Sequence, residues 1–388
     1  MERLHIAFFG PANSGKSTLV NALCGQEVSL VSPHPGTTTD PVRKAVELPG
    51  LGACVLIDTA GLDDESLLGP ERRRRSLSIL DEADIAVVLV GSQVRLPVQM
   101  LDQRERKDTL NASSGPDFGP EGTDIPVVYV FPKADLGGAA PEGAIPVSAV
   151  SGEGIPELLH QLAALAPKME EKGLMEGLVK AGDCVLLVMP QDSEAPKGRL
   201  ILPQVQVLRE LLDRGCNALC CTPESLSSAL ERINPDLVIT DSQVFALVNK
   251  ALPASTPLTS FSVLLAAVKG DIRTFVAGAQ AIDQLSSGDR VLIAEACTHV
   301  PDTEDIGRVK IPALLRKRAD VEVDIAAGND FPEDLSAYSL IIHCGGCVAS
   351  RTLVQSRIKK ALRAGVPITN YGIALAKLQG ILDRIVIP

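Results

Sequence analysis

A strand, a glycine-rich loop and a helix at the N-terminus constrain the fold of this chain more than any other feature. Residues 4–9 are apolar and β-prone, residues 10–17 (GPANSGKS) follow at once, and residues 18–24 are predicted to be helical. In this context the spacing G-x-x-x-x-G-K-S indicates a loop whose backbone amides and helix N-terminus surround phosphates. The sequence therefore predicts an α/β nucleotide-binding domain. Its predicted phosphate contacts are Gly10, Asn13, Ser14, Gly15, Lys16, Ser17 and Thr18.

Two segments further along the chain complete a predicted magnesium site. Asp58 and Gly61 lie in the motif D-T-A-G after the predicted strand 54–57. There the carboxylate can reach the magnesium shell and the Gly61 amide can sense a γ-phosphate. Residues 35–40 (PGTTTD) have the place and composition of a first switch, in which we select Thr38. The predicted magnesium ligands are Ser17, Thr38 and Asp58, and the predicted catalytic residues are Asn13, Lys16, Thr38, Asp58 and Gly61.

These motifs resemble GTPases of the translation-factor-related class that includes the Era and MnmE proteins. Leu62 stands where Ras-like enzymes carry a glutamine that orients the attacking water. Asn13 stands where cation-dependent members of the class place a potassium ligand. The resemblance implies that K⁺, held by Asn13 and the first switch, neutralises charge that develops during hydrolysis. The alternative is that Asn13 is only a polar loop residue.

The base-recognition motif departs from the pattern of this class at one position. After the predicted strand 127–131 the chain reads Pro132-Lys133-Ala134-Asp135, where the class has Asn-Lys-x-Asp. Asp135 can still accept hydrogen bonds from the guanine edge. Ser148 and Ala149 match the loop that backs the guanine. We therefore predict a guanine site formed by Lys133, Asp135, Ser148 and Ala149. We expect it to bind GTP less tightly than relatives with asparagine do, because Pro132 lacks the side-chain amide.

Thiols and imidazoles are concentrated in two short runs near the C-terminus. Cys297-Thr298-His299 and His343-Cys344-Gly345-Gly346-Cys347 each follow an apolar, β-prone segment, at residues 290–295 and 339–342. Both runs should emerge at the carboxyl ends of strands of one sheet, where open α/β sheets bind ligands. Three cysteines with histidine can bind tetrahedral zinc or an iron–sulfur cluster. The residues alone do not separate these metals, and cysteines that merely pack in a turn are the alternative.

Length, charge and cysteine usage limit the class of protein. The 388 residues carry a formal net charge of −11, which disfavours a nucleic-acid surface; the basic run 72–75 is interpreted as a solvated helix face. The nine cysteines resemble no disulfide framework and no signal peptide is recognised, so a cytoplasmic protein is expected. The chain has no run of eighteen apolar residues, so we expect no membrane span.

Two further α/β alternations follow the nucleotide domain. We predict strands at 184–189, 216–222 and 237–240 with helices at 204–213, 224–233 and 242–252, and then an apolar helix at 261–268. A doubly wound sheet is predicted from strands at 290–295, 321–325, 339–342 and 366–369, with helices at 311–318, 352–364 and 374–382. The predicted domains are 1–167, which binds GTP, 168–271, whose apolar surface suggests self-association, and 272–388, which carries the two cysteine runs.

Three smaller features carry predictions of their own. Residues 104–124 are polar and rich in Gly, Pro and Ser, which favours a surface insertion. Cys216, Cys220 and Cys221 fall at a strand, where core packing is favoured over metal binding. The turn Asn370-Tyr371-Gly372 should face the same crevice as the cysteine runs, or else cap the following helix.

Residues 196–206 (PKGRLILPQVQ) resemble a signature of HydF, the family of GTPases that mature FeFe hydrogenase. The family's order of a GTPase domain, a dimerisation domain and a cluster domain with C-x-H then H-C-x-x-C covers this chain. The resemblance implies a 4Fe-4S cluster on Cys297, Cys344 and Cys347, completed by His299, His343 or an exchangeable ligand. It also implies a homodimer or larger oligomer that receives a di-iron H-cluster precursor from radical-SAM maturases and delivers it to the apo-hydrogenase.

Two other functions remain possible from the residues. One is an RNA-modifying or ribosome-assembly GTPase with a structural zinc, which the acidic charge and the lack of a basic RNA-binding module disfavour. The other is a redox enzyme that uses a cluster for electron transfer, which histidines beside an open iron disfavour. Metal content separates the first from the HydF-like function, and an electron-transfer assay separates the second.

Overall fold

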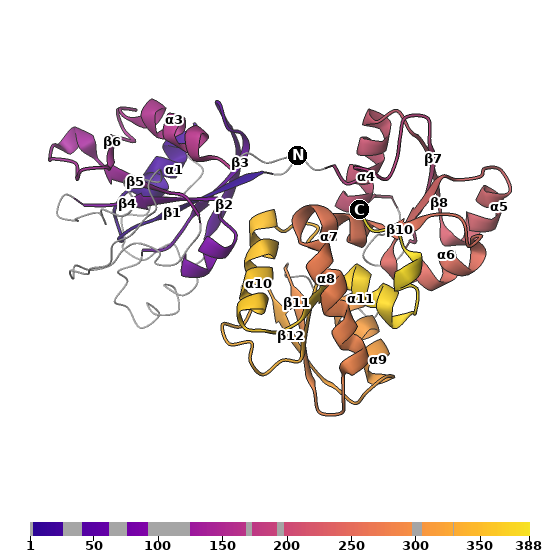
Figure 1. Ribbon diagram of the computed structural model, residues 1–388. Helices are drawn as coiled ribbons and strands as arrows, with labels where there is room; N and C mark the ends of the chain where they lie inside the picture. The colour runs from indigo at the N-terminus through magenta and orange to yellow at the C-terminus, as the bar shows by residue number, and fades with distance from the viewer. Residues whose placement is uncertain are drawn as a thin grey trace, which may run out of the picture. The chain divides into compact units, whose positions relative to one another are not determined.

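The computed structural model describes residues 3–25, 41–61, 76–91, 125–167, 173–191, 198–296, 305–328 and 330–388. It divides into two compact units, residues 1–169 and 170–388 (Figure 1). All three sheets are mainly or wholly parallel and alternate with helices, which confirms the predicted α/β class. The predicted domain boundary at residue 271 falls inside the second unit and stays a prediction. Asp271 itself caps the helix that begins at Ile272.

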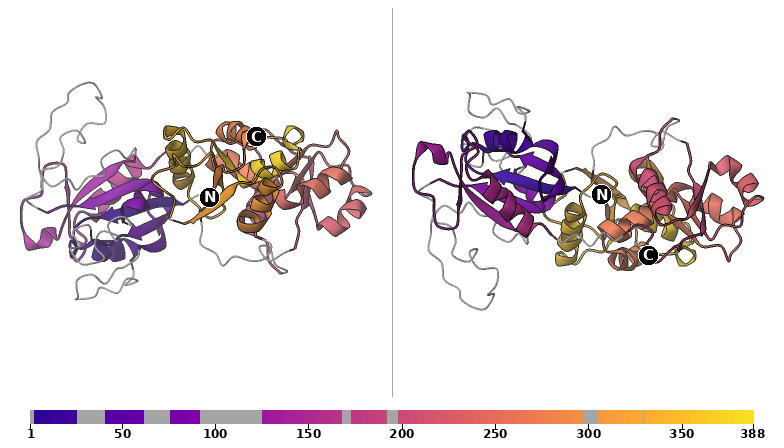
Figure 2. Two further views of the ribbon diagram at one scale, coloured as in Figure 1. Left: turned by 90° about the horizontal axis from the view of Figure 1, so that it is seen from below. Right: turned by 90° about the horizontal axis from the view of Figure 1, so that it is seen from above.

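The first unit contains a six-stranded sheet in the order β2-β3-β1-β4-β5-β6, in which β2 alone is antiparallel. Helices α1 and α3 lie on one face of the sheet, and their apolar residues pack with it (Figure 2). A second cluster of buried residues, most of them from the strands themselves, lies on the other face. Strands β1 and β4 are apolar on both faces, as expected for central parallel strands. The elements are β1 Leu4–Phe9, α1 Lys16–Cys24, β2 Val42–Leu48, β3 Gly52–Asp58, β4 Ile85–Leu89, β5 Val127–Pro132, β6 Ile145–Val147 and α3 Ile155–Leu165.

The second unit begins with a four-stranded parallel sheet in the order β10-β9-β7-β8. The connection from β7 leads to β8 on one side, and the next strands, β9 and β10, lie on the other side of β7. The strand order therefore reverses beside β7. The elements are β7 Cys184–Val188, α4 Leu202–Asp213, β8 Asn217–Cys221, α5 Leu226–Leu230, β9 Leu237–Thr240, α6 Phe245–Ala251, β10 Leu258–Ser260 and α7 Phe261–Lys269.

The same unit continues into a second parallel sheet in the order β12-β11-β13-β14, which confirms the predicted doubly wound arrangement. Its elements are α8 Ile272–Ala279, β11 Arg290–Glu295, α9 Ile311–Arg316, β12 Glu322–Ala327, β13 Leu340–His343, α10 Arg351–Arg363, β14 Ile368–Asn370 and α11 Tyr371–Leu378.

One apolar core joins these two sheets. Leu186 and Val188 of β7 belong to the same buried cluster as Ile293 of β11 and Ile342 of β13. The opposite face of the middle sheet packs with α4 and α7. Helix α7 contacts α4 as well as α8, α10 and α11 of the last sheet. Because the apolar surface is shared, the middle and last sheets stabilise each other.

Three predicted details differ from the structure. The helix predicted at 224–233 is a short 3-10 turn, Pro223–Ser225, followed by α5 only. The last helix begins at Tyr371 rather than at residue 374, because the Asn370 side chain accepts a hydrogen bond from the Ile373 amide. Cys216 is buried, but Cys220 is exposed on β8 and therefore does not pack in the core, since β8 is the edge strand of its sheet.

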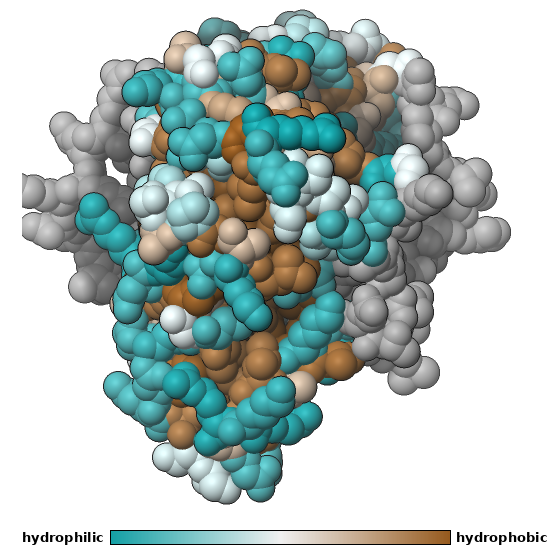
Figure 3. Space-filling view, turned by 90° about the vertical axis from the view of Figure 1, so that its right-hand side faces the viewer, coloured by the Kyte–Doolittle hydropathy of each residue, from teal (hydrophilic) through white to brown (hydrophobic). Residues whose placement is uncertain are grey.

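The face drawn in Figure 3 has hydrophobic residues in a band bordered by hydrophilic ones. Such a mixture is ordinary for a folded surface, because apolar atoms contribute more than half of the accessible area of most proteins. None of the helices in the described residues is both long enough and apolar enough to cross a membrane.

Candidate functional site

The phosphate loop connects β1 to α1 and is closed by its own lysine. The Lys16 ammonium donates hydrogen bonds to the carbonyl oxygens of Gly10 at 3.0 Å and Pro11 at 2.7 Å. Gly15 has φ 99° at the start of the helix, a backbone conformation that favours glycine. At Gly10 a Cβ atom would lie 2.8 Å from the Leu89 carbonyl oxygen. The backbone is thus folded over the buried ammonium, which a phosphate can engage.

Asp58 and Ser17 meet at the end of β3, as the magnesium prediction requires. Ser17 hydrogen-bonds the Asp58 carboxylate, and burial raises the pKa of Asp58, an effect that this hydrogen bond and the charge of Lys16 oppose. Among the described residues the other carboxylate oxygen, Oδ1, is buried without a hydrogen-bond partner. A buried oxygen of this kind is suited to a hard cation, because Mg²⁺ prefers oxygen ligands. The described residues therefore fit a magnesium ion.

Gly61 packs directly on the phosphate loop. A Cβ atom at this position would lie 2.8 Å from both the Cα atom and the backbone nitrogen of Ala12. No real Cβ atom approaches backbone so closely, so only glycine fits here. This contact places the Gly61 amide beside the loop, where it was predicted to sense a terminal phosphate. Thr38 and Leu62 lie outside the described residues, as do the predicted first switch, the basic run 72–75 and the insertion at 104–124.

The base-recognition segment is attached to the phosphate loop through its lysine. Lys133 adopts φ 58°, and its ammonium donates to the Asn13 carbonyl oxygen at 3.0 Å. Asp135 follows in an exposed 3-10 turn. On the neighbouring loop Ser148 is buried, and its hydroxyl accepts from the Ser151 amide at 3.1 Å. The structure thus brings the predicted base-binding residues to the same edge of the sheet as the phosphate loop.

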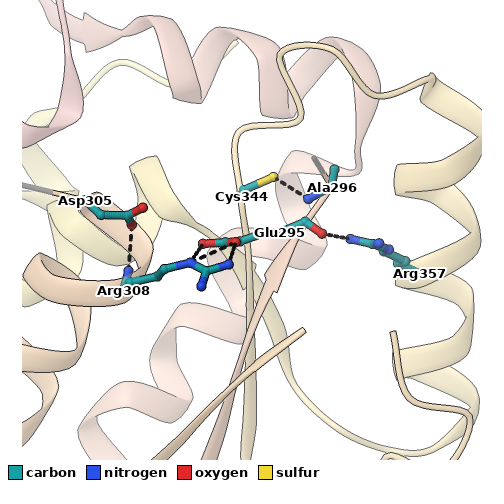
Figure 4. Close-up of polar contacts among 6 residues, drawn as sticks. All are labelled: Glu295, Ala296, Asp305, Arg308, Cys344 and Arg357. Atoms are coloured by element: carbon teal, nitrogen blue, oxygen red, sulfur yellow. Dashed lines mark hydrogen bonds and ion pairs between the residues drawn. The ribbon is translucent and has the colours of Figure 1, made fainter. Parts of the chain in front are cut away.

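The cysteine runs follow adjacent parallel strands, β11 and β13, as predicted. The Ala296 amide, one residue after β11, donates to Cys344 Sγ at 3.1 Å (Figure 4). Cys297 and His299 come next in the sequence but lie outside the described residues. Burial raises the pKa of the Cys344 thiol, and hydrogen bonds from the Ala296 and Gly346 amides oppose this effect. These amides would stabilise a thiolate ligand.

His343 is buried and both of its ring nitrogens have partners. Nδ1 lies 2.7 Å from the Cys344 carbonyl oxygen, so it carries the proton, and Nε2 lies 3.1 Å from Nη1 of Arg357, so it accepts. Burial, followed by the charge of Arg357, lowers the pKa of His343 to about 3, so the ring is neutral. In this arrangement the imidazole is a structural acceptor. Its predicted role as a cluster ligand would require Arg357 to release Nε2.

Arg357 of α10 connects the carboxyl ends of three strands. Its guanidinium donates to the Glu295 carbonyl oxygen after β11, at 3.1 Å, and to the Gly328 carbonyl oxygen after β12, at 2.5 Å. It also donates to His343 at the end of β13 and lies over the Phe331 ring, 5.0 Å from its centroid. Arg357 was not among the predicted site residues. A single arginine on the apolar face of a predicted helix, between Val354 and Ile358, was the available signal.

A buried ion pair lies at the carboxyl end of β11. The Glu295 carboxylate is 2% exposed and pairs with Arg308, whose Nη2 lies 2.7 Å from Oε2 (Figure 4). Asp305 in turn accepts from the Arg308 amide at 2.7 Å. The described residues contain no group of three metal-ligating side chains. The predicted set of three thiols includes Cys297, which lies outside the described residues, so only Cys344 and Cys347 of this set are described.

Three protein-family models match consecutive parts of the chain. Residues 5–114 match a model described as 50S ribosome-binding GTPase. Residues 174–270 match the hydrogen maturase F dimerization domain, and residues 273–388 match the hydrogen maturase F tetramerization domain. The two hydrogen maturase F models together cover more than half of the chain.

Curated relatives match the N-terminal part. The tRNA modification GTPase MnmE of Acidiphilium cryptum is 36% identical over 175 residues, which is 44% of this chain and 35% of the relative. MnmE of a Methylobacterium species is 37% identical over 174 residues, 42% of this chain and 34% of the relative. The chain thus spans about a third of the length of the curated relatives that it matches.

Solved structures also match, with low TM-scores. Aquifex aeolicus Era bound to GDP·AlF4⁻ is 21% identical with a TM-score of 0.35, over 57% of this chain and 93% of that one. The FeoB G-domain from Methanococcus jannaschii is 20% identical with a TM-score of 0.29, over 43% and 99%. The family assignment depends instead on the family models, because two hydrogen maturase F models match successive segments that together cover more than half of the chain. The chain belongs to the hydrogen maturase F (HydF) family.

Proposed function

We propose that this protein is a GTPase that carries an iron–sulfur cluster and serves in the maturation of FeFe hydrogenase. It binds a 4Fe-4S cluster through Cys297, Cys344 and Cys347, receives the di-iron precursor of the H-cluster from radical-SAM maturases, and transfers it to the apo-hydrogenase. The observation that supports this most directly is the 3.1 Å contact between the Ala296 amide and Cys344 Sγ. It brings the strand that leads to Cys297 beside the loop that carries the other two thiols.

The donor set fits a cluster better than a mononuclear site of mixed ligands. Cys344 and Cys347 are separated by two glycines, and Gly346 adopts φ 63°, so the turn can bend around a large group. Thiolates are the usual ligands of iron–sulfur clusters. Three of them leave one iron free for an exchangeable ligand, which is the chemistry that a carrier needs. His343 is already engaged by Arg357.

The nucleotide site is proposed to hydrolyse GTP to GDP and phosphate. Lys16 would exchange its two carbonyl partners for phosphate oxygens, and Ser17 with Asp58 would ligate Mg²⁺. Lys133 orders the loop beside the base, and Asp135 would accept the two guanine donors. Activation by K⁺ through Asn13 remains part of the proposal, because no glutamine follows the D-T-A-G motif.

Self-association is proposed to be independent of nucleotide and of metal. The middle sheet ends in β8, whose outer edge has no partner strand within the described residues. An open edge of this kind can pair with a second copy of the chain. Sedimentation of the full chain should give a dimer or tetramer with and without GTP and iron. A monomer that associates only on nucleotide binding would contradict this.

The cluster is tested by anaerobic reconstitution with iron and sulfide, followed by metal analysis and electron paramagnetic resonance of the reduced protein. We expect a paramagnetic 4Fe-4S signal. Cys297→Ser, Cys344→Ser and Cys347→Ser should each abolish or severely weaken it, and Cys220→Ser on the exposed edge strand serves as the matched control. His299→Ala and His343→Ala should perturb it less. Stoichiometric zinc without iron uptake would contradict the proposal.

A further inference from the structure

The loop that carries Cys344 and Cys347 is contacted by a lysine from a distant part of the sequence. Lys269, the last residue of α7, donates from its ammonium to the carbonyl oxygens of Gly346 at 2.8 Å, Cys347 at 3.2 Å and Ala349 at 2.8 Å. Residues 174–270, which include Lys269, match the dimerization model, whereas the loop matches the tetramerization model. The contact therefore joins the two matched segments at the thiol site.

Three carbonyl oxygens that converge on one point repel each other unless a cation or several donors lie between them. An ammonium has three N–H donors and a full charge, so it satisfies all three oxygens with charge-assisted hydrogen bonds. The lysine is itself fixed, because Gln355 of α10 donates to its backbone carbonyl at 3.2 Å. At the other end of α7, a Cβ atom on Gly345 would lie 3.3 Å from Ser262 Oγ. The loop therefore lies along α7.

We propose that Lys269 is a positioning residue for the cluster site: its ammonium holds the backbone of residues 346–349 so that both thiols are presented together, and its charge favours the reduced cluster. The inference rests on the proposed function for the cluster itself. A 4Fe-4S cluster with three thiolates carries net negative charge that grows on reduction. A cation hydrogen-bonded to the ligand loop offsets that charge and raises the reduction potential.

The first test uses the full-length protein without metal. Hydrogen exchange followed by mass spectrometry reports peptides that cover residues 345–350, where the Ala349 amide donates to the Gly346 carbonyl oxygen. Lys269→Met should raise the exchange rate of this segment about tenfold or more, and Lys269→Arg should raise it less. Lys250→Met, at an exposed position near the end of α6, is the matched control and should change nothing. Equal exchange in Lys269→Met and wild type would contradict the positioning role.

The second test measures the midpoint potential of the reconstituted cluster by redox titration. Lys269→Met should lower the ratio of reduced to oxidised cluster about tenfold at a fixed potential, which is about 59 mV for a one-electron couple. Lys269→Arg, which keeps the charge, should stay close to the wild type. An unchanged potential in Lys269→Met would overturn the electrostatic part.

The two tests separate this inference from the proposed function. If the wild type takes up no iron, the cluster assignment fails while the exchange result still decides whether Lys269 positions the loop. If the wild type binds the cluster and Lys269→Met matches it in exchange, cluster stability and potential, the inference about Lys269 fails alone. Should Lys269→Met not fold, as judged by circular dichroism, Lys269→Gln retains a donor without the charge and is tested in the same way.

Discussion

The phosphate loop and the cysteine loop both follow a buried parallel strand, but they are stabilised in different ways. Lys16 closes the phosphate loop through carbonyls only five and six residues away in the sequence. The cysteine loop is held by Lys269, which is 77 to 80 residues distant, and its strand ends are joined by Arg357. The lysine that closes the phosphate loop is thus local in sequence, whereas the cations that support the cysteine loop come from distant elements. A substitution in the phosphate loop should therefore affect only nucleotide chemistry, whereas one in the supports of the cysteine loop should also lower the stability of the second unit.

A change in the phosphate loop gives the largest expected effect and tests whether that site is local. Lys16→Ala should lower the rate of GTP hydrolysis roughly 10²–10³-fold, because it removes a preorganised charge from the phosphates. Iron and sulfide content after reconstitution should equal that of the wild type. Phosphate release in potassium and in sodium, with metal analysis of the same sample, measures both. A drop in iron content would show that the two sites are not independent.

The distributed site is tested by removing the residue that joins its strand ends. Arg357→Met removes the donor to the Gly328 carbonyl and to His343 Nε2, and leaves the Glu295 carbonyl with the Gly328 amide as its donor. We expect the free energy of unfolding to fall by about 2–4 kcal/mol, the range for buried groups that lose charged hydrogen bonds. Urea denaturation of the metal-free protein measures it. The matched control is Arg363→Met at an exposed position of the same helix, which should stay within about 0.5 kcal/mol.

Base recognition gives a smaller effect and sharpens the local side of the comparison. Pro132 offers no side-chain amide, so Pro132→Asn should gain one or two net hydrogen bonds and tighten GTP binding roughly tenfold. Asp135→Asn should erase the preference for GTP over ATP without weakening the phosphate contacts. Calorimetry with both nucleotides decides. If Pro132→Asn leaves GTP affinity unchanged, the contact from Lys133 to Asn13 already supplies the missing support.

The smallest expected effect concerns the cation. Turnover should be a few-fold faster in potassium than in sodium, because K⁺ would offset charge that develops on the phosphates. The difference should shrink in Asn13→Ala. Rates are compared at equal ionic strength. Identical rates in the two salts for the wild type would argue against a potassium ion at Asn13.

Much of the fold follows from local sequence patterns. The predicted strands 4–9, 237–240 and 290–295 agree with β1, β9 and β11 because each is an apolar run bounded by polar or glycine residues. The phosphate loop was predictable for the same reason, since its residues are contiguous. Cys297, the predicted first switch at 35–40 and Leu62 lie outside the described residues, so the predictions about them stay untested.

The supports of the cysteine loop could not be predicted in the same way. Lys269 is an ordinary lysine at a helix end, and its three partners are backbone carbonyls that carry no sequence signal. The histidine beside Cys344 looked like a ligand because its residue type is common in metal sites. Its actual partner, Arg357, is fixed only when α10 packs beside β13. Long-range contacts of this kind depend on the assembled fold.

The apolar core shared by the middle and last sheets would link the proposed iron site to the stability of the whole second unit. A ligand that binds only the folded form stabilises every element that unfolds together with its site. Because Leu186 and Ile342 belong to one buried cluster, the strands of both sheets should melt in a single transition. Loading of the proposed cluster should then raise the melting temperature of the middle sheet as much as that of the sheet that carries the thiols. The forms with and without the proposed cluster would thereby differ in the thermal stability of the sheet to which self-association is assigned in the proposal.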